Sequence, residues 1–226
     1  MTLNLLEAVR AEAPGATVLL ASSGEVYGPP DALPVEERAP LRPQNPYAVS
    51  KATADLLGGL YADAHGLRVV RARAFNHAGP GQSPTYVVSS LARQAARALR
   101  DGRSPVPITT GDPSPRRDFT DVRDVVRAYR LLAERAEPGV YNVCSERSTS
   151  VAELIEMLGR ACGVDVEHSV DPALLRPHEV PEVRGSAARL REATGWHPEI
   201  PLERTIADAV EWWKRAPAAD VAAGSG

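Results

Sequence analysis

ATVLLA at residues 16–21, followed at once by Ser22 and Ser23, is a short continuous run of apolar residues. Such a run is typical of a strand that is buried on both faces of a parallel sheet. Residues 47–64 have the apolar spacing of a helix, and residues 67–74 (LRVVRARA) form a second strand. Strands that alternate with helices predict βαβ units and an α/β fold.

The alternation continues on both sides of this stretch. Ser150 has the position and chemistry of a helix N-cap, and the small-residue tail 216–226 is expected to be disordered. Further helices are predicted at 2–13, 85–101, 121–136, 151–162, 186–193 and 202–214, with strands at 106–110 and 140–143.

Composition excludes several classes of protein. The chain has 226 residues, a net charge of −3 and a pI near 6.0, so we expect no nucleic-acid partner. No apolar run reaches the length of a membrane span, and neither the two cysteines nor the five histidines have metal-ligand spacing. We therefore predict a cytoplasmic protein with no membrane partner and no metal.

Tyr47 and Lys51 are the residues with the clearest chemistry. Four residues apart on a helix, they lie on one face, where the ammonium favours the phenolate form of the tyrosine. Ser23, just past the neighbouring strand, is placed to hold a carbonyl or alcohol oxygen against that tyrosine. This set can move a proton while a hydride leaves or joins the same carbon. Taken alone, the pair also occurs by chance on solvated helix faces.

Three segments in this order carry a resemblance: residues 22–28 (SSGEVYG), 46–51 (PYAVSK) and 73–76 (RAFN). They resemble the extended short-chain dehydrogenase/reductase family, the NAD-dependent epimerases and dehydratases of nucleotide-diphosphate sugars. The resemblance runs from Met1 to about Lys214. It implies an NADP or NAD cofactor and catalytic Ser23, Tyr47 and Lys51, with Tyr47 and Lys51 also at the nicotinamide ribose.

Residues 75–84 (FNHAGPGQSP) are similar to a stretch of the GDP-sugar 4-reductases, which reduce GDP-4-keto-6-deoxymannose. The resemblance thus implies reduction of a GDP-4-keto-6-deoxy-hexose at C4. GDP-mannose 4,6-dehydratases share much of the same frame. Further matching segments are 87–89 (VVS), 92–94 (ARQ), 117–124 (RDFTDVRD), 141–144 (YNVC) and 194–198 (TGWHP).

The resemblance also implies residues that bind the nucleotide sugar. Arg117 and Arg176 are cations suited to a diphosphate, because guanidinium pairs well with phosphate oxygens. Asn76 is expected on the diphosphate or a sugar hydroxyl, Val88 at the substrate, and Glu179 on ribose hydroxyls. The alternatives are solvated surface arginines and an exposed loop acid.

Phe75 and His77 are implied at the nicotinamide, largely through backbone groups, with a structural role as the alternative for His77. Family members commonly dimerise through the helix that carries Tyr47 and the helix before it. A homodimer is therefore expected, with Leu56, Leu57, Leu60 and Tyr61 either forming that face or packing on the chain's own sheet.

Glu25 supports a second function. In dehydratases of the family, a glutamate two residues before the Tyr-Gly pair removes the C5 proton, which the C4 ketone acidifies. Glu25 holds that position before Tyr27 and Gly28. Non-dehydratases also keep an acid there, and Gly24 replaces the polar residue that dehydratases usually have. GDP-mannose 4,6-dehydratase, a lyase, is the alternative to the oxidoreductase.

The glycine-rich phosphate turn of dinucleotide folds is not found in this sequence. Gly79 and Gly81 follow a strand, but adjacent prolines rule out a phosphate-binding helix start. We therefore predict a partial Rossmann-type parallel sheet without its amino-terminal βαβ units, and a small carboxy-terminal substrate-binding α/β lobe. The predicted division is 1–145 for the Rossmann-like part with substrate-lobe insertions, 146–215 for the lobe and 216–226 for the tail.

This prediction allows a third interpretation, an inactive fragment without its dinucleotide-binding half. Apolar strand edges such as Val18, Leu19 and Leu20 are then expected to be uncovered. Weak stability, self-association and no tight cofactor binding by the chain alone would follow.

Overall fold

The computed structural model describes residues 1–175 and 179–216. It divides into two compact units, each assembled from three stretches of chain. The first unit consists of Met1–Asn76, Arg123–Arg147 and Val183–Pro198, and the second of His77–Val122, Ser148–Glu182 and the residues from Glu199 onward. Arg176 and the tail 217–226 lie outside the described residues.

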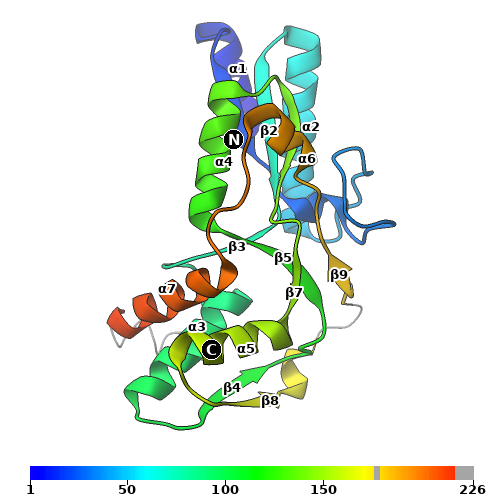
Figure 1. Cartoon of the computed structure of the whole chain (residues 1–226). Helices are drawn as coiled ribbons and strands as arrows, with labels where there is room; N and C mark the ends of the chain where they lie inside the picture. Colours follow the sequence, from blue (N-terminus) through cyan, green and yellow to red (C-terminus); the bar gives the residue numbers. More distant parts are fainter. Residues whose placement is uncertain (176–178, 217–226) are drawn as a thin grey trace. The chain divides into compact units, whose positions relative to one another are not determined.

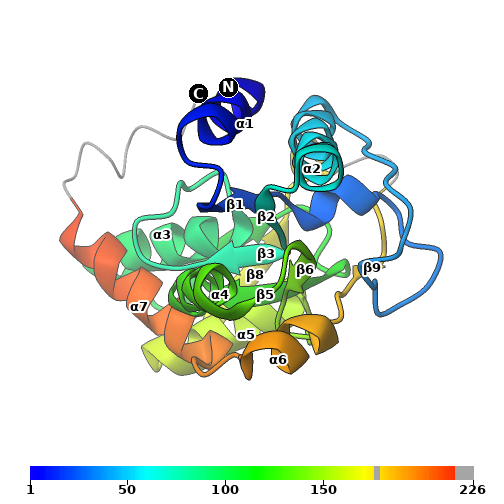
Figure 2. The ribbon, with the colours of Figure 1, turned by 90° about the horizontal axis from the view of Figure 1, so that it is seen from above.

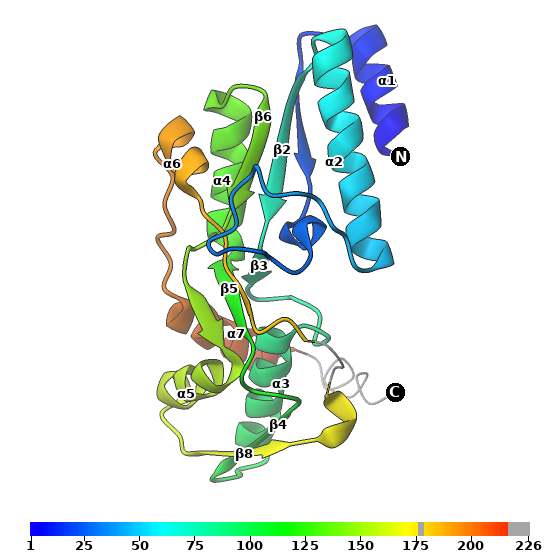
Figure 3. The ribbon, with the colours of Figure 1, turned by 90° about the vertical axis from the view of Figure 1, so that its right-hand side faces the viewer.

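The first unit is built on a parallel sheet with the strand order β1–β2–β6 (Figure 1). Ala21 of β1 pairs with Ala72 of β2, and Arg73 of β2 pairs with Asn142 of β6. Helices α1 and α2 lie on one side of this sheet and α4 on the other (Figures 2 and 3). Its elements are α1 (Thr2–Glu12), β1 (Thr17–Ala21), the 3₁₀ helix η1 (Gly24–Tyr27), α2 (Pro46–His65), β2 (Arg68–Ala74), α4 (Val122–Arg135), β6 (Gly139–Val143) and α6 (Ala188–Thr194).

The expectation of uncovered apolar side chains on β1 is wrong for Val18 and Leu20, whereas Leu19 is partly buried. β1 is an edge strand of the described sheet, yet Val18 and Leu20 are only 7% and 8% exposed. They pack in a buried cluster with Leu6 of α1, Tyr61 of α2 and Val69 of β2. Helices α1 and α2 therefore cover the apolar face of β1, because side chains of a strand point to the sheet's faces rather than along its edge.

The second unit combines two small sheets with helices α3, α5 and α7, which pack together (Figure 1). One sheet has the order β3–β5–β7 with β9 also on β5, and the other pairs β4 with β8. Trp213 of α7 lies in the core between these helices and donates to the Ser89 hydroxyl at 3.0 Å. The elements are β3 (Asn76–Ala78), α3 (Val87–Arg100), β4 (Val106–Thr110), β5 (Arg116–Asp121), β7 (Ser148–Ser150), α5 (Val151–Cys162), β8 (Val166–Val170), the 3₁₀ helix η2 (Pro172–Leu174), β9 (Glu182–Val183) and α7 (Leu202–Arg215).

The α/β class, the parallel sheet and all the predicted helices are confirmed. Ser150 caps α5 through a full capping box with Glu153. The helix predicted at 121–136 begins one residue later, at Val122, because Asp121 is the last residue of strand β5. β5 escaped prediction because its sequence RRDFTD lacks the alternating apolar pattern of a strand.

Within the described residues, no helix is long and apolar enough to cross a membrane. In the same part of the chain, no group of three histidine, cysteine, aspartate or glutamate side chains is arranged to hold a metal ion.

Candidate active site

Tyr47 and Lys51 lie in the first turns of α2, which begins with a strong local signal. Asn45 is the N-cap, its side chain accepts from the Ala48 N–H at 2.8 Å, and Pro46 occupies the first turn. The Lys51 ammonium lies 5.7 Å from the centre of the Tyr47 ring. It also donates to the carbonyl of Ala21 at 2.9 Å, which ties α2 to the end of β1.

Tyr47 is 52% exposed, so about half of the residue is accessible from outside the chain. The Lys51 ammonium has three donors, and within the described residues one of them is used by Ala21. A phenol and an ammonium with spare donors thus share one accessible face of α2.

Ser23 follows β1 and caps η1. Its Oγ accepts from the Glu25 N–H at 3.2 Å, and the side chain is buried. A serine hydroxyl both accepts and donates, so the cap leaves its hydrogen for a ligand oxygen. Helix η1 packs against α2, which brings the Ser23 segment to the helix that carries Tyr47.

Glu25 is exposed, and its Oε2 accepts from the Asn45 side chain at 3.0 Å. Asn45 therefore links the candidate base to the N-terminus of α2. Sequence reasoning missed Asn45, although the pair Asn45-Pro46 before an apolar helical pattern is an N-cap signal that could have revealed it.

The residues after β2 separate into buried and exposed positions. Phe75 is buried, its N–H donates to the carbonyl of Val143 at 2.9 Å, and its ring lies 6.3 Å from that of Tyr27. Asn76 and His77 are exposed. The His77 carbonyl accepts from the Gln82 side chain at 2.8 Å. Phe75 and Asn76 belong to the first unit and His77 to the second.

Arg117 and Glu179, both in the second unit, form an ion pair at 2.9 Å. The Arg117 Nη1 also donates to the carbonyls of Val180 and Arg116. Val88 is buried in the core of this unit, so only its backbone in the first turn of α3 is suited to a ligand. Predicted substrate residue Arg176 lies outside the described residues.

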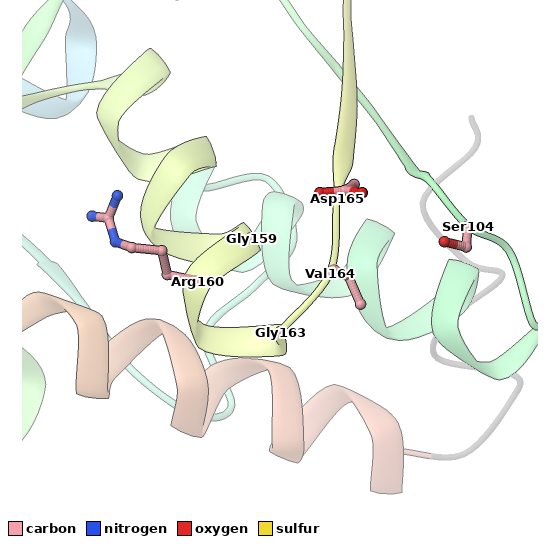
Figure 4. A pocket seen from close by; sticks show the side chains of 6 residues that line it. All are labelled: Ser104, Gly159, Arg160, Gly163, Val164 and Asp165. Carbon is pink, nitrogen blue, oxygen red and sulfur yellow. The ribbon is translucent and has the colours of Figure 1, made fainter.

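A hollow of about 440 Å³ in the second unit does not involve these residues (Figure 4). In Figure 4 the Arg160 guanidinium extends away from Ser104 and Asp165. None of the residues that line the hollow belongs to the predicted site. The lining residues are Ser104, Gly159, Arg160, Gly163, Val164 and Asp165.

Comparison with known proteins places the chain in a family. Residues 1–209 match the family model described as GDP-mannose 4,6 dehydratase. The chain belongs to that family. Among curated proteins, the chain is similar to the GDP-6-deoxy-D-mannose reductase of Pseudomonas aeruginosa, with 44% identity over 216 residues. The match covers 94% of the chain and 71% of the reductase. The chain is 27% identical over 243 residues to the GDP-mannose 4,6-dehydratase of Yersinia enterocolitica, covering 92% of the chain and 64% of that enzyme.

Among solved structures, the family chain matches RMD from Pseudomonas aeruginosa complexed with NADPH, with a TM-score of 0.87 and 42% identity. The match covers 94% of this chain and 71% of that one. The predicted resemblance to Rossmann-type sugar-nucleotide enzymes is thereby confirmed. The assignment of individual site residues stays a prediction.

Proposed function

We propose that this protein reduces a GDP-4-keto-6-deoxy-hexose at C4, with NADPH or NADH as the reductant. The observation that carries the proposal is the placement of Lys51, which lies beside the Tyr47 ring and is bonded to the end of β1 just before Ser22 and Ser23. The 44% identity to a GDP-6-deoxy-D-mannose reductase favours this reaction over its alternatives.

Each residue has a distinct role in the proposed reaction. Tyr47 gives its phenolic proton to the C4 oxygen as the ketone becomes an alcohol, and Ser23 donates a hydrogen bond to that same oxygen. Lys51 stabilises the phenolate that remains. The nicotinamide, when bound, supplies the hydride.

The residues at hand fit the nicotinamide end of such a cofactor. Lys51 has donors to spare for ribose hydroxyls, and Tyr47 is exposed beside it. Phe75 and His77 are proposed to contact the nicotinamide through their backbone, in keeping with the buried Phe75 ring.

Five residues are proposed to contact the substrate. Arg117 and Arg176 would hold the diphosphate, Glu179 the ribose hydroxyls, Asn76 a sugar hydroxyl or the diphosphate, and Val88 the substrate through its backbone. The division into a Rossmann-like part (1–145) and a substrate lobe (146–215) stays a prediction, as does a cytoplasmic location.

Glu25 supports 4,6-dehydration as a second candidate. Its carboxylate is exposed, two residues past Ser23, and the hydrogen bond from Asn45 orients it. A carboxylate in that place is able to take the C5 proton during loss of water.

We also propose a homodimer through α1 and α2, which lie side by side (Figure 3). Leu56 and Leu60 of α2 are 61% and 57% exposed, and Leu3 and Leu5 of α1 are exposed as well. Leu57 and Tyr61, also expected on this face, instead pack in the cluster beneath α1 and α2. A second copy of the chain would remove the exposed leucines from water.

The proposal is tested by adding GDP-4-keto-6-deoxymannose and NADPH to the purified chain and following the absorbance of NADPH. Tyr47→Phe is expected to lower kcat about 10² to 10⁴-fold, the usual contribution of a general acid. Tyr61→Phe is the matched control, because it makes the same change on the same helix but in a buried cluster.

Turnover assays, together with calorimetric titrations of GDP-mannose and of NADPH, separate the outcomes. The proposal is supported if the wild type and Tyr61→Phe reduce the sugar nucleotide and Tyr47→Phe does not. Elimination of water from GDP-mannose that is lost in Glu25→Gln supports the dehydratase instead. Binding of GDP-mannose without binding of NADPH, and without turnover, refutes activity of this chain by itself and supports the inactive-fragment interpretation.

A further inference from the structure

The row of α2 residues that begins with Tyr47 and Lys51 continues into a buried ion pair. Asp55 is the next residue in that row, one helical turn beyond Lys51. Its carboxylate is fully buried and accepts from Arg73 of β2 at both oxygens, at 2.8 Å from Nε and 2.7 Å from Nη2. Arg73 is also buried, so both charges are removed from water.

The pair continues into a chain of hydrogen bonds. The Arg73 Nη1 donates to the Tyr27 hydroxyl at 3.0 Å, and the guanidinium lies 5.0 Å from the centre of the Tyr27 ring. The Tyr27 hydroxyl in turn donates to Asn142 Oδ1 of β6 at 2.7 Å. Burial raises the pKa of Tyr27 to about 12, so the phenol keeps the proton that it donates. This series of hydrogen bonds ends at a backbone group, because Asn142 Nδ2 donates to the carbonyl of Val35 at 3.0 Å.

The elements that these four residues join are those that carry the proposed chemistry. Tyr27 ends η1, the 3₁₀ helix capped by Ser23. Asp55 belongs to α2, and Arg73 lies two residues before Phe75 at the end of β2. Arg73 and Asn142 face each other in the register of neighbouring strands.

Stability alone gives little reason for charges in this place. A buried ion pair is often no more stabilising than well-packed apolar residues of the same volume, because both ions lose their hydration. What an apolar cluster does not provide is direction, since a bidentate guanidinium–carboxylate pair fixes both partners in one plane.

We infer that Asp55, Arg73, Tyr27 and Asn142 are a positioning network that sets the Tyr47–Lys51 face of α2 against the Ser23 segment. The four residues are positioning residues rather than catalytic ones. The inference rests on the proposed function for its consequence in turnover, but its structural content is independent of activity.

Tyr27→Phe tests the network with the smallest change, because it removes one hydroxyl and keeps the ring. Tyr141→Phe is a closely matched control. Tyr141 is buried in the same apolar core as Tyr27, but its hydroxyl donates to the carbonyl of Glu137 at 2.9 Å and not to a residue of the network.

Two readouts are taken on the full chain. The first is the ¹³Cζ signal of Tyr47 in protein labelled on its six tyrosines, assigned with Tyr47→Phe. The second is the steady-state rate with GDP-4-keto-6-deoxymannose and NADPH. Tyr27→Phe is expected to move the Tyr47 signal and to lower kcat at least tenfold, with KM for the sugar nucleotide within about twofold. Tyr141→Phe is expected to change neither, even at an equal loss of stability. Arg73→Lys is a second variant, which keeps the positive charge but cannot form the bidentate pair with Asp55. It is expected to have the same effects as Tyr27→Phe.

The outcomes separate the inference from the proposed function. A Tyr47 signal that stays in place in both Tyr27→Phe and Arg73→Lys overturns the network, whether or not the chain turns over. A signal that moves in a chain without reductase activity supports the network and sinks the proposed function. Activity that falls equally in Tyr27→Phe and Tyr141→Phe assigns Tyr27 a structural role only and also overturns the inference.

Discussion

Gly28, which follows η1, allows a sharp prediction about the loop behind Ser23. Its backbone has φ 65° and ψ −154°, a region that only glycine enters readily. A Cβ at this position would lie 2.2 Å from the backbone carbonyl oxygen of Arg42. That oxygen is held in place, since it accepts from the Gln44 side chain at 2.8 Å.

The cost of Gly28→Ala follows from these two effects. Backbone strain in this region costs about 1–3 kcal/mol, and overpacking against a fixed group adds about 1–3 kcal/mol. We therefore expect a loss of about 4 kcal/mol in the free energy of unfolding. Gly66→Ala is the matched control, because Gly66 also has a positive φ of 66° but a Cβ added there would meet nothing within 4 Å. Its expected cost is about 1 kcal/mol.

Urea unfolding, followed by circular dichroism, measures the free energy of unfolding of both variants and of the wild type. The comparison requires that the dependence of this free energy on urea concentration is the same in all three. The expected difference between the two variants is about 3 kcal/mol, from the steric part and from the rarer backbone region of Gly28. Equal losses in Gly28→Ala and Gly66→Ala would refute the reasoning, because the contact with Arg42 would then cost nothing.

Three further predictions concern charge, substrate and assembly. Burial raises the pKa of Asp55, but the hydrogen bonds and charge of Arg73 outweigh it and hold that pKa below its ordinary value of 3.8. The stability that Asp55 adds relative to Asp55→Asn is thus expected in full above about pH 5 and to shrink as the pH falls below about 4, measured by urea titrations at several pH values; a gap that widens in acid would contradict this. Arg117→Ala should weaken GDP binding about tenfold or more in calorimetry, as expected for a charge-assisted contact. The neighbouring Arg116 pairs with Glu153, so Arg116→Ala should leave GDP binding unchanged. Equal effects of the two substitutions would remove Arg117 from the diphosphate site. Leu60→Glu should convert a dimer to a monomer in sedimentation, while Leu174→Glu, at an exposed position of the second unit, should leave it intact; a wild-type monomer would end the dimer proposal.

Local features of the candidate site were predictable from the sequence. The distance of four residues between Tyr47 and Lys51 places them on one face of any helix, and the apolar run before Ser22 marks the end of a strand. Glu25 was recognised by its place before Tyr27 and Gly28, but its hydrogen bond from Asn45 joins residues that are far apart in sequence.

The residues of the buried network show why the rest was out of reach. Asp55 in a helix and Arg73 in a strand look like ordinary solvated charges in the sequence. Their burial results from the packing of α2 on β2, and no pattern along the chain carries it.

The sequence by itself determined the helices, the apolar strands, the α/β class and the two catalytic candidates on α2, because each depends on residues close together in the chain. The tertiary structure decided the pairing of polar β5 with β7, the assembly of each unit from three separate stretches and the partners of Asp55 and Glu25. These depend on contacts between distant residues, whose energies come from burial and hydrogen-bond geometry that exist only once the chain has folded.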